Sequence, residues 1–118
     1  MSEANEHLIE MGRRIHKRRK NMGLSQEQLA DKAGLSAQVI STSERGVKAL
    51  RPENICKLCN ALGVSSDYIL YGVYSDKDID ELHDKLRRLT PTQLSRIMGI
   101  VDLLTEENEY SEVSNAGE

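Results

Sequence analysis

The stretch that most limits the possible folds of this 118-residue chain is residues 25–46, SQEQLADKAGLSAQVISTSERG. It holds two short helical patterns, which only the three residues 34–36 separate. Ser25 and Gln28 have the spacing of a capping box, in which each side chain satisfies a free backbone amide at a helix start. Ser36 is expected to cap the second helix. A link this short that contains a glycine holds its two helices at a steep angle.

Apolar residues at helical spacing predict three further short helices around this pair. One covers about residues 6–21, one has Pro52 in its first turn, and one follows from about residue 64. The positions predicted to face the core are Ile9, Met11, Ile15, Met22, Leu29, Ala30, Ala33, Leu35, Ile40, Ile55, Leu58, Cys59, Leu62, Val64, Ile69 and Leu70. We therefore expect an all-α fold with a five-helix module at residues 7–74 and a flexible N-terminus at 1–6.

A second, C-terminal pair of helices is predicted over residues 75–105. Thr90, Pro91 and Gln93 are expected to supply the cap, the first position and the capping-box partner of its second helix. Each helix has an apolar stripe, formed by Ile79, Leu82, Leu86 and Leu89 in one and by Leu94, Ile97, Met98, Val101 and Leu104 in the other. Such stripes must pack on each other, on the module or on another chain. Residues 106–118 are acidic and polar, which predicts disorder.

Charge is distributed unevenly along the chain, whose formal net charge is −3. Residues 1–75 contain eleven Lys or Arg against eight Asp or Glu, whereas residues 76–118 contain five against eleven. This asymmetry indicates a basic working module with an acidic appendage. Six of the eight residues in RRIHKRRK, 13–20, are basic. That run is either a solvated helix face or a source of long-range attraction for an anionic partner.

The residues that enzymatic or metal chemistry needs are not grouped in this sequence. Cys56 and Cys59 form a CxxC motif, but zinc would need two more ligands, and the three His are scattered. We interpret both Cys as small buried or half-buried positions one helical turn apart. With no Gly-rich phosphate loop and no nucleophile beside a base, we expect no enzyme, no cofactor and no metal. No apolar run approaches the roughly 18 residues of a membrane span, so we expect a cytoplasmic protein.

Residues 11–72 resemble the helix-turn-helix family of lambda-repressor-like and Cro-like regulators, also called the xenobiotic-response-element family. The resemblance lies in MGRRIHKRRKNMGLSQEQLADKAGLSAQVISTSERG followed by ICKLCNALGVSSDYILYG, where glycines, caps and apolar positions are in register. It implies that the third helix lies in the major groove of DNA and that the second helix begins against the phosphates. Two residues depart from the pattern. At Ser43 the family usually has an aliphatic residue, so we expect either that the Ser43 hydroxyl bonds back to the helix or that the helix packs less tightly. At Arg18 the family usually has an apolar residue.

The resemblance also implies roles for individual residues. Those predicted to read bases are Ala37, Gln38, Ser41 and Thr42. Gln38 suits an adenine and Ala37 suits a thymine methyl group. Those predicted to contact phosphates are Gln26, Ser36, Arg45, Lys48 and Arg51. Arg19 and Glu44 match a structural pair that bridges the first and third helices.

Members of this family usually bind palindromic double-stranded DNA as dimers, with half-sites about one helical turn apart. The acidic helical pair would repel phosphates, so we expect it to form a homodimer rather than to bind DNA. Its predicted contacts are Leu82, Leu86, Leu89, Leu94, Ile97, Met98, Val101 and Leu104. The sequence thus predicts a dimeric DNA-binding repressor of the prophage or mobile-element type in the prokaryotic cytoplasm. The alternative is an antitoxin-like autoregulator whose C-terminal helices bind a partner protein, and the pair could also pack on its own module.

Overall fold

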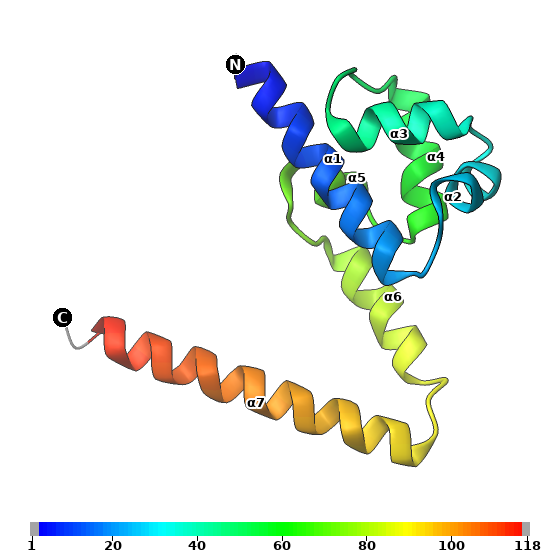
Figure 1. Ribbon diagram of the computed structural model, residues 1–118. Coiled ribbons are helices and arrows are strands. Elements are labelled where there is room, and N and C mark those ends of the chain that lie inside the picture. Colours follow the sequence, from blue (N-terminus) through cyan, green and yellow to red (C-terminus); the bar gives the residue numbers. More distant parts are fainter. Residues whose placement is uncertain (1–2, 117–118) are drawn as a thin grey trace. The chain divides into compact units, whose positions relative to one another are not determined.

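The computed structural model describes residues 3–116, and these residues form seven α-helices and no strand. The helices are α1 (Glu3–Asn21), α2 (Gln26–Ala33), α3 (Ala37–Arg45), α4 (Pro52–Leu62), α5 (Ser66–Tyr71), α6 (Asp76–Leu86) and α7 (Pro91–Ala116) (Figure 1). The chain divides into two compact units, a first unit that ends at Asp80 and a second that begins at Glu81. The predicted all-α fold is confirmed.

The core of the first unit is aliphatic, and each of its five leading helices contributes to it. The fully buried large side chains are Ile15 from α1, Leu29 from α2, Ile40 from α3, Leu58 and Leu62 from α4, and Ile69 from α5. All six were predicted to face the core. Within this unit α1 contacts α3, α4 and α5, and α2 contacts α3 and α4. The helices therefore enclose one core despite their short lengths, because every one of them has an apolar face directed inward.

Local capping explains where the short helices begin. The Ser25 hydroxyl accepts a hydrogen bond from the Gln28 amide (3.0 Å), and the Gln28 side chain accepts one from the Ser25 amide (2.8 Å). Ser36 caps α3 by accepting from the Val39 amide, and Pro52 occupies the first turn of α4. Gly34, with φ +70°, allows the left-handed turn between α2 and α3. These predicted starts are confirmed.

Two glycines let α1 pass unusually close to the C-terminal end of α3. A Cβ atom on Gly12 would overlap the backbone carbonyl oxygens of Ser43 and Glu44. A Cβ atom on Gly46 would lie within 3 Å of the Ile9 backbone, and the φ angle of Gly46 is +67°. The backbones of α1 and α3 are thus in direct contact, which holds α3 against the longest helix of the first unit.

The helix ends differ from the prediction at both termini. The sequence predicted a flexible segment at 1–6, but α1 already begins at Glu3, because Glu3 and Glu6 are good helix formers and favour the positive helix start. It also predicted disorder from residue 106, but α7 continues to Ala116. No Pro or Gly interrupts residues 100–116, and the Thr105 hydroxyl donates to the Val101 and Asp102 carbonyls without ending the helix. The predictions for residues 1–2 and 117–118 lie outside the described residues.

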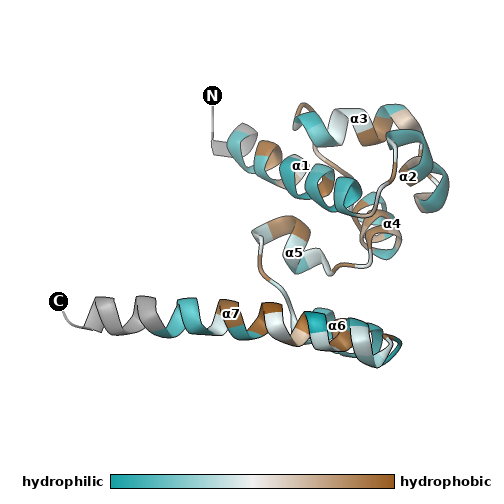
Figure 2. Cartoon of the chain, turned by 60° about the horizontal axis from the view of Figure 1, so that its bottom comes forward, coloured by the Kyte–Doolittle hydropathy of each residue, from teal (hydrophilic) through white to brown (hydrophobic). Residues whose placement is uncertain are grey.

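The second unit exposes much of its apolar surface. Thr90 and Gln93 form the predicted capping box at the start of α7, with bonds of 3.0 and 3.2 Å. Leu86, Leu89 and Ile97 are half-buried. The large apolar side chains of α7 with more than a third of their surface exposed are Leu94, Met98, Ile100, Val101, Leu103 and Leu104. Figure 2 shows these hydrophobic residues along the first half of α7. Among the described helices, none is sufficiently long and apolar to cross a membrane.

Candidate nucleic-acid interface

The outward face of α3 is small, polar and accessible. Gln38, the second residue of the helix, is exposed, and its side-chain amide has no hydrogen-bond partner among the described residues. Ala37, Ser41 and Thr42 are half-buried beside it. The Thr42 hydroxyl donates to the Gln38 and Val39 carbonyls at 3.0 and 3.2 Å, which fixes its side-chain rotamer. This face can therefore offer an amide, hydroxyl oxygens and methyl groups to a ligand without first breaking a side-chain contact of Gln38.

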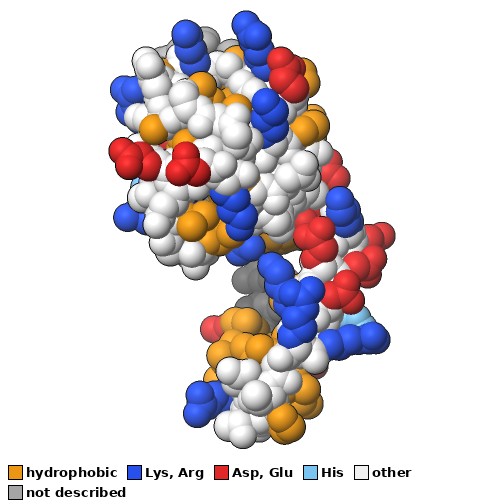
Figure 3. Space-filling view, turned by 90° about the vertical axis from the view of Figure 1, so that its right-hand side faces the viewer, with side chains coloured by type: hydrophobic (Ala, Val, Ile, Leu, Met, Phe, Trp, Pro, Cys, Tyr) orange, Lys and Arg blue, Asp and Glu red, His pale blue; other side chains and the backbone are white. Residues whose placement is uncertain are grey.

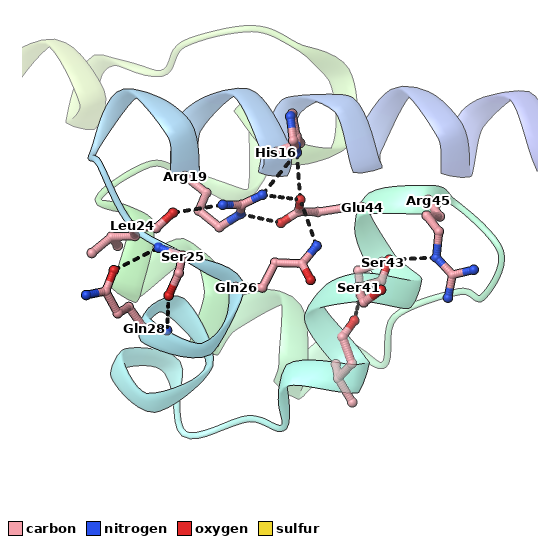
Figure 4. A network of polar contacts seen from close by, with 11 residues as sticks. His16, Arg19, Leu24, Ser25, Gln26, Gln28, Ser41, Ser43, Glu44 and Arg45 are labelled. Atoms are coloured by element: carbon pink, nitrogen blue, oxygen red, sulfur yellow. Dashed lines mark hydrogen bonds and ion pairs between the residues drawn. The ribbon is translucent and has the colours of Figure 1, made fainter.

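Glu44 holds α3 to α1 through a buried ion pair. The Arg19 guanidinium donates to both Glu44 carboxylate oxygens, from Nε at 2.7 Å and from Nη2 at 2.9 Å (Figure 4). Only 6% of the Arg19 side chain and 4% of the Glu44 side chain are exposed. Arg19 also donates through Nη1 to the Leu24 carbonyl at 2.8 Å. The structure brings Arg19 and Glu44 together, as the sequence led us to expect, and their bidentate geometry restrains the angle of α3 as well as its position.

Two further side chains donate to Glu44. His16 Nδ1 lies 2.7 Å from Glu44 Oε1, and Gln26 Nε2 donates to the same oxygen at 3.4 Å. Burial acts to raise the pKa of Glu44, but the hydrogen bonds from Arg19 and His16 outweigh it, so this pKa lies below its ordinary value. The pKa of Arg19 is raised, chiefly by its hydrogen bond to Glu44. His16 Nδ1 also lies 3.2 Å from Arg19 Nη2, so it donates to Glu44 only in the tautomer that carries the proton on Nδ1.

Gln26 lies where the start of α2 meets the C-terminal end of α3. Its amide nitrogen is directed toward Glu44, as the sticks in Figure 4 show, so one N–H remains for another acceptor. The first backbone amides of α2 lie at the same helix start, where the helix dipole favours an anion. The sequence predicted a phosphate contact for Gln26 but missed its bond to Glu44, because the two residues are eighteen positions apart in the chain.

Half of the basic residues in the run 13–20 are used inside the first unit. Arg18 Nε donates to the Leu62 carbonyl at the C-terminal end of α4 (2.8 Å), and Arg14 Nη1 donates to the Ile69 carbonyl in the last turn of α5 (3.0 Å). Each guanidinium thus satisfies a carbonyl at the negative end of a helix. With Arg19 paired to Glu44, the exposed members of the run are Arg13, Lys17 and Lys20. Arg18, where the family resemblance led us to expect an apolar residue, thus has a polar partner inside the first unit.

Ser43 also has a local partner. It is buried, and its hydroxyl donates to the Val39 carbonyl at 2.6 Å. Of the two outcomes predicted for this departure from the family pattern, the bond back to the helix is the one observed. The hydroxyl is satisfied within α3, so burying it leaves no unpaired polar group in the core.

The predicted phosphate contacts at the end of α3 and in the loop after it are exposed but do not form one continuous basic patch. Arg45, Lys48 and Arg51 are all exposed, and Arg45 Nε lies 3.4 Å from the Ser41 carbonyl oxygen. Ser36 is exposed too, although its hydroxyl is used to cap α3. Figure 3 shows separate Lys and Arg side chains with uncharged surface between them on one face of the first unit. Separate basic side chains of this kind can each bind a phosphate, but they attract DNA only weakly at long range.

The CxxC motif on α4 is split between the core and the surface. Cys59 is buried, as predicted, and burial raises the pKa of its thiol to about 11. Cys56 is exposed, which corrects the prediction that both are at least half-buried. The buried face of α4 includes Leu58 and Cys59. Cys56, three positions before Cys59, lies at the edge of this face and is therefore exposed. In the described part of the chain, no cluster of three or more His, Cys, Asp or Glu side chains could hold a metal ion.

Comparison with known proteins identifies relatives of the first unit. Residues 15–69 match the family model described as helix-turn-helix. The chain is 37% identical over 71 residues to the SPbeta prophage-derived uncharacterized HTH-type transcriptional regulator YonR of Bacillus subtilis (strain 168). That alignment covers 60% of this chain and 66% of YonR, so the chain matches just under two thirds of this relative.

Two solved structures are similar to the same part of the chain. The restriction-modification controller protein C.AhdI from Aeromonas hydrophila is 35% identical, with a TM-score of 0.51, over 52% of this chain and 94% of its own. The P22 c2 repressor protein, solved in complex with a synthetic operator, is 40% identical, with a TM-score of 0.52, over 53% of this chain and 96% of its own. The chain therefore belongs to the helix-turn-helix family of lambda-repressor-like transcriptional regulators.

Proposed function

We propose that this protein is a dimeric, sequence-specific DNA-binding repressor that reads the major groove with α3. The observation that carries the proposal is the exposed Gln38 amide, which has no hydrogen-bond partner among the described residues and lies on a small polar helix face. The residues of α3 that precede Glu44 carry no charged side chain. The helix can therefore approach base edges closely. The buried Arg19–Glu44 pair supports this role because it holds α3 rigidly against α1.

Each residue of the reading face has a chemistry that suits a base edge. The Gln38 amide can donate to and accept from one adenine, and the Ala37 methyl group can pack on a thymine methyl group. Ser41 and Thr42 offer hydroxyl oxygens, although the Thr42 proton is already directed to α3 carbonyls. Thr42 would therefore accept rather than donate. The remaining contacts would be phosphate contacts from Gln26, Ser36, Arg45, Lys48 and Arg51.

The dimer would form through the apolar surface of the second unit. In α7, Leu94, Ile97, Val101 and Leu104 repeat at intervals of three and four residues, as in a helix–helix seam. Val101 and Leu104 are 49% and 53% exposed, so the described residues leave this seam largely uncovered. Leu82, Leu86, Leu89 and Met98 would extend the contact. A second copy suits it because one reading helix makes few base contacts and a dimer doubles them.

The proposed repressor role rests on the character of the relatives. YonR is described as prophage-derived, and the P22 c2 protein is described as a repressor bound to an operator. A protein that occupies a promoter blocks it without any further domain. This role would be carried out in the prokaryotic cytoplasm.

The test is to select duplexes from a random pool with the full-length protein at moderate salt, with sedimentation of the same preparation. The proposal predicts a dimer and a palindrome with half-sites about 10 base pairs apart. Transcription from a promoter that carries the palindrome should fall when the protein is added, and a rise would identify an activator. A folded monomer that enriches no sequence would overturn the proposal. The α6–α7 surface would then be the binding site for a different protein, as in an antitoxin-like autoregulator.

A further inference from the structure

Charged residues of opposite sign are segregated along α7 and the turn that precedes it. Residues 87–101 contain three basic residues and no acidic one, whereas residues 102–118 contain six acidic residues and no basic one. Those whose side chains the structure describes are all exposed, namely Arg87, Arg88, Arg96, Asp102, Glu106, Glu107 and Glu109. The segment therefore presents a basic end and an acidic end, with the apolar seam between them.

This order of charges does not stabilise α7 itself. A helix favours acidic residues in its first turn and basic residues in its last turn. The first turn of α7 has no acidic residue and its last turn has no basic one, while Arg87 and Arg88 lie just before its positive end. The ion pairs between described side chains all lie in the first unit. The charges at both ends of α7 are therefore available to another molecule.

We propose that α7 pairs with α7 of a second copy in antiparallel orientation. The proposal rests on the proposed function, since it requires a dimer that forms through α7. Leu94 and Leu104 are each five positions from residue 99, and Ile97 and Val101 are each two positions from it. An antiparallel pair centred there places Leu94 opposite Leu104 and Ile97 opposite Val101 of the second copy. A parallel pair would also match apolar residues, so the charges decide the orientation.

Opposite charges meet at both ends of the antiparallel pair. Glu107 of one copy lies opposite Pro91 of the other, because both are eight positions from residue 99. Arg87 and Arg88 are in the turn that leads to this helix start, so they lie near the acidic end of the second copy. In a parallel pair, Glu107 and Glu109 would instead lie beside the same residues of the second copy and repel them. Charges that flank an apolar seam set helix orientation in this way.

The test reverses the charges at the two ends and measures the dimer dissociation constant of the full-length protein by sedimentation equilibrium at low salt. The acidic-end variant Glu107→Lys/Glu109→Lys should raise this constant by about tenfold or more, because two symmetric contacts exchange attraction for repulsion. Adding Arg87→Glu/Arg88→Glu to the same chain should return the constant to within about threefold of wild type. High salt should reduce both differences.

A matched control separates the position of a charge from the net charge of the chain. Asp80→Lys/Asp84→Lys changes the net charge by the same amount, at two exposed residues on the side of α6 away from its apolar stripe. Because a less negative chain repels its second copy less, this control should not weaken the dimer. Weakening that is confined to the acidic-end variant therefore comes from the position of the charges.

Two results would overturn the antiparallel pair. If Glu107→Lys/Glu109→Lys tightens the dimer more than the control does, the two helices are parallel. If it leaves the dimer unchanged, the ends of α7 lie outside the interface. A wild-type chain that remains monomeric would instead contradict the proposed dimer itself. Circular dichroism verifies the helix content of each variant, and if the reversal unfolds α7 the comparison is made with Glu107→Gln/Glu109→Gln, for which we expect a weakening of about threefold.

Discussion

At the scale of single residues, Glu44 connects the stability of the first unit to the position of α3, the proposed reading helix. It lies in α3 and accepts hydrogen bonds from Arg19 and His16 in α1 and from Gln26 in α2. Removing its charge would leave the buried Arg19 guanidinium without a counter-ion. A buried ion pair that loses one member typically costs more than the pair itself contributes.

Replacing Glu44 by Gln should therefore lower the free energy of unfolding by roughly 3–5 kcal/mol at neutral pH. The pKa of Glu44 in the folded protein lies below its ordinary value of 4.5. Its charge thus stabilises the folded state above the unfolded pKa, and this contribution is lost as the pH falls through the folded pKa. Urea unfolding followed by circular dichroism should find the wild-type protein more acid-sensitive than Glu44→Gln. An identical acid response of both proteins would exclude Glu44 as the source.

Lys48 provides a test of the phosphate contacts. It is exposed in the loop between α3 and α4, and we propose that it binds a phosphate. Replacing it by Ala should weaken binding to every DNA sequence alike and reduce the slope of log affinity against log salt by about 1. The exposed Lys85 in the second unit supplies the control, since Lys85→Ala should keep the wild-type slope. An unchanged slope in Lys48→Ala would remove Lys48 from the contact set.

At the scale of helices, local sequence signals predicted the starts of α2, α3, α4 and α7, because caps and Pro act within one turn. They did not predict that Arg14 and Arg18 donate to backbone carbonyls at the ends of other helices. The two carbonyls lie 55 and 44 residues away, and every residue type has a backbone carbonyl, so no sequence pattern marks them. The end of α7 was missed for a different reason. Acidic residues that favour disorder by their charge are also good helix formers once a helix has begun.

The close contact of α1 with α3 can be tested through its glycine. Gly12→Ala should lower the free energy of unfolding by roughly 1–3 kcal/mol, because its methyl group overlaps the Ser43 and Glu44 carbonyls. Gly99 also lies in a helix, α7, but a Cβ atom there meets open space. Gly99→Ala should therefore raise helix stability by roughly 0.5–1 kcal/mol. Denaturant unfolding followed by circular dichroism distinguishes the two, and a neutral Gly12→Ala would mean that the helices separate at little cost.

At the scale of the whole molecule, the two units differ in charge and in exposed apolar surface, which suits them to different partners. The first unit holds the compact core and the candidate interface, and the second is acidic with an exposed apolar helix. An acidic surface is unsuited to DNA, and exposed Leu, Ile, Val and Met side chains are suited to another protein surface. The reading positions could be proposed from sequence, but the occupant of the apolar surface could not, because apolar contacts specify no single partner.

Dimerisation through α7 is tested by introducing a charge into its apolar seam. Met98→Glu should raise the dimer dissociation constant by more than about tenfold, because it places a carboxylate in an interface that excludes water. Thr92→Glu adds the same charge to the same helix on the side opposite the seam, where Thr92 is exposed, and should leave the dimer intact. Sedimentation equilibrium of both variants gives the comparison. A dimer that resists Met98→Glu would place the interface outside α7.

The central claim is that α3 reads bases through Gln38, and the most direct measurement is selection of duplexes from a random pool by wild-type protein and by Gln38→Ala. We predict the same palindrome for both, except that Gln38→Ala loses preference at one symmetric position in each half-site. That loss should correspond to roughly 1–3 kcal/mol of specific binding, with non-specific binding retained. Selection of an identical sequence with undiminished preference at every position would contradict the claim.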